Sequence, residues 1–421
     1  MKKVMSFFLV FLLLLCVSGS FLACANNNID SGIEDKVGAS VNDKSNSYTP
    51  SVHEPTEGLR YSLMDDDTYG ICGYEGEDRA VYIPDTYKNK PVSAIYENAF
   101  KETSITLVSL PNSIREIEAS AFANCVKLKS ITIPSNVTII GDGAFAGCRE
   151  LASASLGDGV ISIGENAFYG CSGLTAVDIP NSVTTIGGSS FANCSGLTSI
   201  TIGNGVKEVG SGAFSGCSSL TAVDIPNSVT TIGGSSFANC SGLTSITFGN
   251  GIKEVGSSAF SGCSSLTTMI LPNSLQAVGG SLFYGCNGLV SLTVPYLGRD
   301  KVATDATESS LFGYYFGSTG YSIGVMQRYN EYSTKYYLIP TSLQSVTVSS
   351  GRIQSYSFMN CSMLTSITIG RNVASIGTSA FSGCSNLTDI YYQGTMAQWD
   401  VLQKDSGWDS GLSNYTIHLT D

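Results

Sequence analysis

The chain has 421 residues and a net charge of −12, with 34 acidic and 22 basic residues. This balance disfavours nucleic acid and anionic lipid headgroups as partners of the folded part, because proteins that bind them carry basic surfaces. The two histidines, His53 and His418, neighbour no nucleophile in a catalytic pattern, and the sequence has no Cys-x-x-Cys motif or phosphate-binding loop. The sequence therefore predicts a protein that is not an enzyme and has no cofactor or metal site.

Residues 1–23 have the pattern of a secretory signal peptide. Lys2 and Lys3 precede an apolar run over residues 7–15, which is short for a membrane-spanning helix. Residues 21–24, Phe-Leu-Ala-Cys, resemble a bacterial lipobox, which would make Cys24 the lipid-carrying first residue of the exported chain. We expect anchoring to the membrane at the bacterial cell surface through lipid on Cys24. Cleavage without lipidation, which would give a secreted protein, is the alternative.

Residues 24–58 are predicted to form a lipidated, flexible tether. They contain Asn, Ser, Asp, Gly and Pro and few large apolar side chains, so they cannot bury enough surface to order themselves. A flexible coil of this length reaches about 30 Å. Loss of residues 1–23 would leave 20 basic and 34 acidic residues, a net charge of −14.

Residues 59–104 are predicted to be an N-terminal opening unit with short strands near residues 81–84 and 90–92. The acidic cluster Asp65–Asp67 lies just before Tyr69, and no spaced set of oxygen ligands follows it. A turn explains this cluster better than a cation site does.

A phenylalanine and a cysteine, three residues apart, recur every 23 residues over much of the remaining chain. A fixed period of this length is typical of a solenoid, in which one supersecondary unit stacks on the next. We assign these repeats to residues 105–294 and 346–389. The pairs are Phe122/Cys125, Phe145/Cys148, Phe168/Cys171, Phe191/Cys194, Phe214/Cys217, Phe237/Cys240, Phe260/Cys263, Phe283/Cys286, Phe358/Cys361 and Phe381/Cys384.

One repeat, residues 174–196, shows the expected course of a coil. Val177 and Ile179 alternate with polar or small residues, which predicts a short strand with these two side chains inward. Residues 180–182, Pro-Asn-Ser, favour a turn, and residues 183–186 a second short strand. Residues 190–194 are too few for a full helix and are predicted to form a helical or 3₁₀ turn.

The cysteines of the repeats allow more than one interpretation. Eleven cysteines remain after Cys16 in the signal and Cys24 are set aside, and an odd number cannot pair completely. Side chains on adjacent coils run parallel at about 4.8 Å, which fits a disulfide poorly. We favour small, buried free thiols over disulfides and over zinc ligands.

The strings Leu-x-x-Ile-x-Ile-Pro, Val-x-x-Ile-Gly and Ala-Phe-x-x-Cys resemble the treponemal type of leucine-rich repeat found in BspA-like bacterial surface proteins. The resemblance covers roughly residues 69–399. It implies an α/β fold, a right-handed horseshoe or superhelix of short parallel strands. It also implies surface display and binding of host or neighbouring-cell molecules.

Residues 174–219 and 220–265 are near copies that differ at three positions, so the unit there has 46 residues. The outward strand positions of the repeats are mostly Ser and Thr, and Asp178 and Asp224 are the charged exceptions. A solvated sheet is one interpretation of this surface. A shallow binding surface for a protein or glycan, with Asp178 and Asp224 as contacts, is the other.

Residues 295–345 interrupt the repeat with a tyrosine-rich insertion. Insertions in solenoids often emerge on the binding face, and tyrosine is enriched at interfaces. Packing of these rings onto the coils is the competing explanation. The candidate ligand contacts are Tyr314, Tyr315, Phe316, Tyr321, Tyr329 and Tyr332.

Residues 390–421 are predicted to be a C-terminal cap that covers the open end of the last coil. Both tryptophans, Trp399 and Trp408, lie in this segment. A short helix from Met396 to Lys404 would turn Trp399 and either Val401 or Leu402 inward.

The sequence thus predicts a lipid-anchored surface protein that displays a leucine-rich-repeat solenoid for adhesion to or recognition of proteins or glycans. A structural envelope or spacer protein without a specific ligand is the first alternative. A hydrolase with a pocket built by the insertion is the second.

Overall fold

The computed structural model describes residues 54–300, 310–318, 324–328 and 336–420. The expected signal peptide, Cys24 and residues 24–53 of the expected tether lie outside these ranges. Within them, no helix has both the length and the apolar character needed to cross a bilayer.

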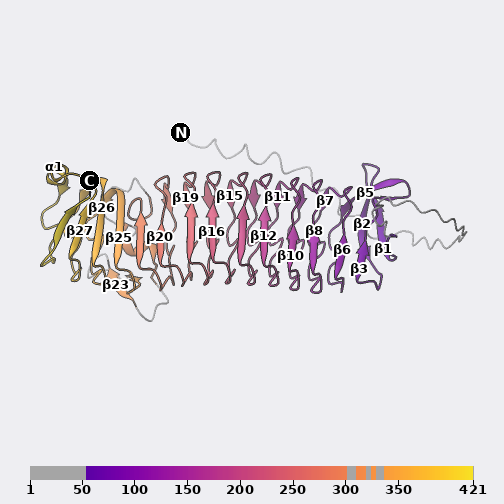
Figure 1. Ribbon diagram of the computed structural model, residues 1–421, viewed down its shortest axis with the longest axis horizontal. Helices are drawn as coiled ribbons and strands as arrows, with labels where there is room; N and C mark the ends of the chain where they lie inside the picture. Colours follow the sequence, from indigo (N-terminus) through magenta and orange to yellow (C-terminus); the bar gives the residue numbers. More distant parts are fainter. Residues whose placement is uncertain (1–53, 301–309, 319–323, 329–335, 421) are drawn as a thin grey trace, which may run out of the picture.

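The chain winds into an extended rod of stacked coils with the N-terminal strands at one end and the C-terminal cap at the other (Figure 1). Each regular coil contributes one strand to a main wall and a two-residue strand to a second wall. Strands of neighbouring coils pair in parallel, and paired residues lie one 23-residue repeat apart, as with Val177 and Ile200. The solenoid of parallel strands is therefore confirmed, and its right-handed winding stays a prediction.

The main wall consists of three hydrogen-bonded sheets that follow one another along the rod. The first contains β3 (Ala80–Tyr82), β6 (Leu107–Ser109), β8 (Ser130–Thr132), β10 (Ser153–Ser155), β12 (Ala176–Ile179) and β14 (Ser199–Ile202). The second contains β16 (Ala222–Ile225) and β18 (Ser245–Phe248). The third contains β20 (Thr268–Ile270), β22 (Ser291–Val294), β25 (Ser345–Ile353), β26 (Ser366–Ile376), β27 (Asp389–Tyr392) and β29 (Thr416–Leu419).

The second wall is one sheet of mostly two-residue strands. It contains β1 (Leu59–Leu63), β2 (Tyr69–Tyr74), β5 (Lys90–Ile95), β7 (Glu116–Ile117), β9 (Ile139–Ile140), β11 (Ser162–Ile163), β13 (Thr185–Ile186), β15 (Glu208–Val209), β17 (Thr231–Ile232), β19 (Glu254–Val255) and β21 (Ala277–Val278). β4 (Thr86–Tyr87) pairs with β5, and β28 (Gln403–Lys404) pairs with β26. The hairpin of β23 (Val325–Arg328) and β24 (Tyr336–Ile339) stands apart from both walls.

The expected helical turn at residues 190–194 is wrong. The N–H groups of Ala192 and Cys194 close single turns, but those of Phe191 and Asn193 donate to carbonyls of the following coil, so consecutive helical hydrogen bonds do not form. Ser189 and Asn193 adopt positive φ values of 53° and 60°, which no α or 3₁₀ helix tolerates. The segment is therefore a chain of turns that forms a third ladder between coils.

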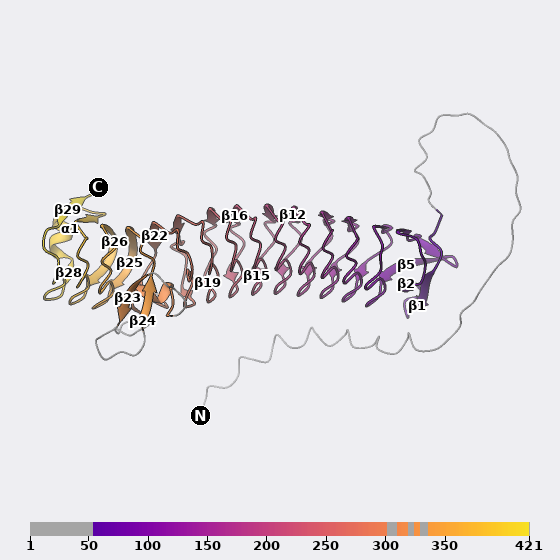
Figure 2. The same ribbon diagram turned by 90° about the horizontal axis from the view of Figure 1, so that it is seen from below.

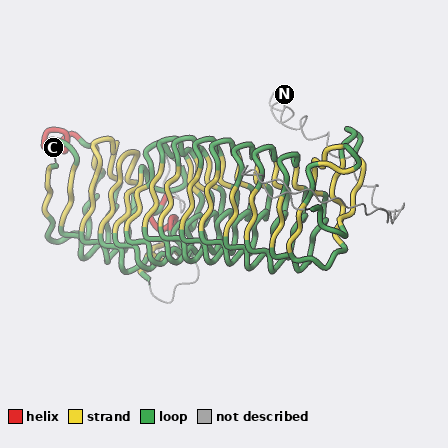
Figure 3. Tube along the Cα trace, turned by 45° about the vertical axis from the view of Figure 1, so that its right-hand side comes forward, coloured by secondary structure: helices red, strands yellow, loops and turns green. Residues whose placement is uncertain are grey.

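The α-helix of the described residues is confined to α1 (Met396–Val401), and a 3₁₀ segment, η2 (Phe312–Tyr315), lies in the insertion (Figure 3). The fold is thus nearly all β rather than α/β. When coils contain only strands and turns, the distance between successive coils equals the strand spacing on every side. Packed helices would require about 10 Å between successive coils on one side. This explains why the rod bends little, in contrast to the horseshoe that the resemblance implied (Figure 2).

The positive φ before each ladder cysteine explains a further sequence pattern. That position needs the left-handed conformation, which glycine and asparagine adopt most readily. It is occupied by Asn124, Gly147, Gly170, Asn193, Gly216, Asn239, Gly262, Gly285, Asn360 and Gly383, all with positive φ.

The alternation of Pro-Asn-Ser and Gly-Asn-Gly turns in the 46-residue unit also has a packing reason. A Cβ added at Gly205 would lie 2.0 Å from the carbonyl oxygen of Asn181, and one at Gly203 would lie 2.4 Å from that of Pro180. The N–H of Asn204 donates to Oδ1 of Asn181 at 2.7 Å. A coil with Gly-Asn-Gly therefore fits closely over a coil with Pro-Asn-Ser.

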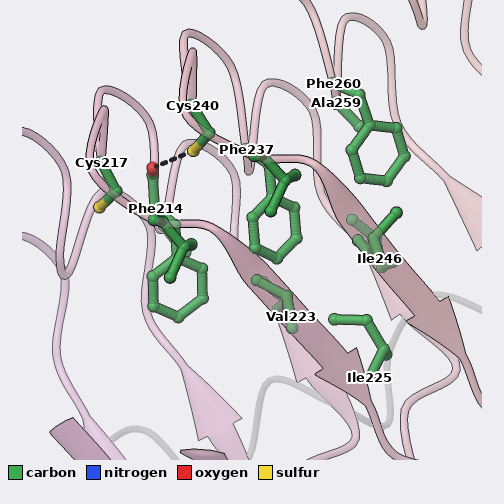
Figure 4. Packing of buried hydrophobic residues seen from close by; sticks show 14 of the residues in the cluster. Phe214, Cys217, Val223, Ile225, Phe237, Cys240, Ile246, Ala259 and Phe260 are labelled. Atoms are coloured by element: carbon green, nitrogen blue, oxygen red, sulfur yellow. Dashed lines mark hydrogen bonds between the residues drawn. The ribbon is translucent and has the colours of Figure 1, made fainter. Parts of the chain in front are cut away.

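The phenylalanines form the predicted core ladder. From Phe100 to Phe283, neighbouring rings are stacked with centroids 5.0–6.0 Å apart, and every ring of this series is fully buried. Val177 and Ile179 point inward, as expected. Figure 4 shows how Phe214, Phe237 and Phe260 lie against Val223, Ile225 and Ile246 of the main wall.

The ladder cysteines are buried thiols, as predicted, and they do more than fill space. Sγ of Cys240 donates to the carbonyl oxygen of Phe214 in the preceding coil at 3.2 Å (Figure 4). The same bond recurs from Cys125 to Cys286 at 2.9–3.3 Å. Burial raises the pKa of the Cys240 thiol to about 12, so the sulfur stays protonated and can donate.

Candidate interaction surfaces

The hydroxyl face is the outer surface of the main wall, formed by the outward residues of β8 to β22 and of β26. Asp178 and Asp224 lie exposed on this face, and Oγ1 of Thr247 donates to Oδ1 of Asp224. Ile270, with 61% of its surface exposed, interrupts the polar row. Asp178 and Asp224 are thus accessible, and their contact with a ligand stays a prediction.

The insertion places two of the predicted contacts in the core. Tyr315 and Phe316 are fully buried, and Oη of Tyr315 donates to the carbonyl oxygen of Tyr296 at 2.6 Å. Neither side chain can reach a ligand, so their assignment as contacts is wrong. Tyr314 is half-buried, and its pKa is raised by burial. Tyr321, Tyr329 and Tyr332 lie outside the described residues.

The burial of these rings has a clear cause, because η2 bridges a gap in the ladder. The ring of Tyr315 lies 6.4 Å from that of Phe283, and the ring of Phe312 lies 4.9 Å from that of Phe358. On the main wall, β22 pairs directly with β25, so the insertion leaves the line of strands between them. These residues of the insertion thus occupy the core positions of a missing coil. Packing of the rings onto the coils, the competing explanation, accounts for them.

Gln327 on β23 fastens the hairpin to the rod, and no sequence pattern marks it. Its side chain is fully buried. Oε1 accepts from the N–H of Gly313 at 2.6 Å, and Nε2 donates to the carbonyl oxygen of Ser357 at 2.8 Å. The amide thus supplies both a donor and an acceptor where a regular coil is missing.

We expect Gln327→Leu to lower the free energy of unfolding by about 1–3 kcal/mol, because it leaves the buried N–H of Gly313 unpaired, whereas the Ser357 carbonyl still accepts from the N–H of Phe312. Gln276→Leu, at an exposed position, should change stability by no more than about 0.5 kcal/mol. Urea denaturation of both variants measures the difference. Equal stability of the two would contradict the role given to Gln327.

A corner groove runs beside the second wall, where residues of four successive coils line one edge. It has a volume of about 490 Å³ and is open to solvent on one side. Oδ1 of Asp142 accepts the N–H of Glu165 at 2.8 Å, which fixes one end of the groove. Its lining is Asp142, Ser162, Ile163, Gly164, Glu165, Thr185, Ile186, Gly187, Gly188, Glu208, Gly210 and Ser211.

The C-terminal end of the main wall carries a polar cluster that the sequence did not reveal. Nε2 of His418 on β29 lies 2.7 Å from Oδ1 of Asp389 on β27, and its ring stacks on Tyr391 at 4.7 Å. Hydrogen bonds from Thr388 and from His418 lower the pKa of Asp389. The hydrogen bond between His418 and Asp389 joins the last strand to its neighbour. Only the pairing of these two strands brings the two side chains together.

The acidic cluster Asp65–Asp67 lies in the turn between β1 and β2, as expected. The N–H of Asp67 donates to the carbonyl oxygen of Met64, and Asp67 pairs with Lys90. Among the described residues, no group of three or more histidine, cysteine or acidic side chains is placed to hold a metal ion.

A family model for the BspA type leucine-rich repeat region, in six copies, matches residues 93–221, 208–300 and 330–401. The chain belongs to the BspA-type leucine-rich-repeat family. The match covers the repeats on both sides of the insertion, so this BspA-type protein carries its family signature over most of the rod.

Solved structures of bacterial leucine-rich-repeat proteins resemble this BspA-type chain. One from Bacteroides ovatus is 26% identical, covers 86% of this chain and 90% of its own, and has a TM-score of 0.59. One from T. pallidum is 31% identical over 51% of this chain and 90% of its own, with a TM-score of 0.41. A leucine-rich cell surface protein from Faecalibacterium prausnitzii is 23% identical over 86% of this chain and all of its own, with a TM-score of 0.30. The comparison with curated proteins found no significant match.

Proposed function

We propose that this BspA-type protein is displayed on the bacterial cell surface by lipid on Cys24 and recognises proteins or glycans of host or neighbouring cells. The observation that carries the proposal is that the core and the outer surface of each coil are formed by different residues. The Phe and Cys ladders supply the core, so the outer faces of the walls are free to vary without loss of the fold. The family membership supports a surface or interaction protein, and one neighbour is described as a cell surface protein.

Two experiments test the proposal. Metabolic labelling with a fatty-acid probe should mark the parent and leave Cys24→Ala unlabelled, because the thiol is the expected attachment atom. The purified chain should bind members of an array of matrix proteins, mucins and glycans. An unlabelled parent would contradict the anchor, and an array without any bound member would contradict recognition.

A spacer without a ligand is the second candidate, and the near-identical coils of residues 174–265 favour it. Copies that differ at three positions lengthen the rod without varying its faces. The array separates this candidate from recognition.

A further inference from the structure

We propose that the corner groove binds an extended, basic polypeptide segment. The inference rests on the proposed function and narrows its ligand class. It depends on the shape of the groove, on two exposed isoleucines at its margin and on the charge of its lining.

The shape of the groove comes partly from a glycine that the fold does not require. A Cβ added at Gly187 or Gly210 would lie 2.6 or 2.7 Å from the backbone of the preceding coil, so those glycines serve coil stacking. A Cβ at Gly188 would meet its nearest neighbour at an ordinary 3.4 Å. Coil packing thus leaves room for a side chain at Gly188, and its absence keeps the groove open.

Two exposed isoleucines lie at the N-terminal margin of the groove. Ile139 on β9 pairs with Ser162, which lines the groove, and Ile161 directly precedes Ser162. These side chains are 46% and 49% exposed, although each could be polar without cost to the core. One coil further along, Thr185 occupies the position equivalent to Ser162, and Thr184 occupies the position equivalent to Ile161. The isoleucines give this part of the second wall an apolar contact area that the copied coils lack.

The charge of the lining selects the occupant. Asp142, Glu165 and Glu208 contribute carboxylates, and none of the ion pairs among the described residues involves them. At the margin, Glu116 pairs with Ile139, whereas Arg115 and Lys207 lie in the row of Ile161, so the negative charge of the groove comes from the three carboxylates of its lining. A basic segment would compensate these carboxylates, whereas a neutral glycan would not, and the lining offers no aromatic ring for a sugar to stack on.

An extended chain also fits the dimensions. The lining spans four successive coils, which follow one another at the spacing of neighbouring strands, about 4.8 Å, so its first and last coils lie about 14 Å apart. In an extended segment, side chains on one face repeat about every 6.7 Å. In alternating lysine and valine, the lysines share one face, so lysines four residues apart span about 13 Å and can reach carboxylates at both ends of the groove. The aliphatic stems of these lysines can pack on Ile139 and Ile161.

The test uses the purified chain and a fluorescein-labelled (Lys-Val)₄ peptide, with (Glu-Val)₄ and (Ser-Val)₄ as comparison peptides. Fluorescence anisotropy should show saturable binding of the lysine peptide that weakens with added salt. Gly188→Leu should lower its affinity at least tenfold by filling the groove. Glu208→Gln and Ile161→Thr should each lower it about threefold, as expected for one exposed charge or one partly exposed apolar contact.

The 46-residue duplication supplies matched controls outside the groove. Gly234→Leu and Glu254→Gln repeat two of the substitutions in almost identical coils and should leave the affinity within twofold of the parent. Melting curves of Gly188→Leu and Gly234→Leu establish that both fold. Equal loss of peptide affinity in the two leucine variants, or no preference for the lysine peptide, would overturn the inference.

The same variants distinguish this inference from the broader proposal. Recognition fails if the parent binds nothing on the array of matrix proteins, mucins and glycans. The groove fails as the binding site if Gly188→Leu binds the lysine peptide as tightly as Gly234→Leu does, whatever the array shows.

Discussion

Phe214→Ala should lower the free energy of unfolding by roughly 3–5 kcal/mol, the cost of removing a fully buried aromatic ring and leaving a cavity. Phe214 lies in the middle of the ladder, with the rings of Phe191 and Phe237 at centroid distances of 5.5 and 5.3 Å. Because a solenoid is stabilised by interfaces between neighbouring coils, the cavity weakens two interfaces at once. The destabilisation should therefore appear in urea denaturation and as faster amide exchange in the coils on both sides.

Phe248→Ile is the matched control for this variant. Phe248 is half-buried on β18, packs edge-to-face on Phe260 at 5.9 Å, and has Ile202 as its counterpart in the preceding copy. Its replacement by the residue of the other copy should cost less than about 1.5 kcal/mol. A Phe214→Ala variant as stable as Phe248→Ile would show that the ladder does not hold the coils together.

The strands and the core were predictable because they depend on local periodicity and on the repeat. Alternation of inward and outward residues placed Val177 and Ile179 correctly, and the 23-residue period identified the ladder partners of Phe191 and Cys194. The turn at residues 190–194 was not predictable in the same way. Its short run of Ser, Phe, Ala and Asn is compatible with a helical turn, and bonds to the next coil decide against it.

The surfaces were harder to predict because they depend on neighbours in space. Tyr315 and Phe316 have the composition of an interface, yet a gap in the ladder buries them. The corner groove is formed jointly by four coils, and Gly188 has no local feature that separates it from the stacking glycines around it. Gln327 likewise shows its role only once β23 lies beside η2.

The C-terminal cap was predicted in outline, and its helix is shorter than expected. α1 ends at Val401, because Gln403 and Lys404 pair with β26 as β28. Trp399 is buried and Leu402 packs on the core, while Val401 is 82% exposed. The side chain of Thr395 accepts from the N–H of Gln398 and completes a capping box, which fixes the start of so short a helix.

A chain that ends at Cys384 should aggregate, because the cap covers the last ring of the ladder and the last edges of both walls. The ring of Trp408 lies edge-on to that of Phe381 at 6.1 Å, and Trp399 packs behind Trp408 at 5.8 Å. Truncation would also remove β27 and β28, which pair with opposite ends of β26. An unpaired edge of this length invites pairing with another chain. Light scattering after purification measures the outcome, and a monomeric truncated chain would contradict the role of the cap.

A point variant tests the same role without removing strands. Trp408→Ala should cost about 2–3 kcal/mol, less than a fully buried ring, because Trp408 is half-buried. Val401→Ser, on the exposed side of the same cap, should change stability by no more than about 0.5 kcal/mol. The loss in Trp408→Ala should begin at the C-terminal coils, since each coil of a solenoid depends on its neighbour. Amide exchange that accelerates first near Phe381 and last near Phe122 would meet this expectation, and uniform acceleration along the rod would contradict it.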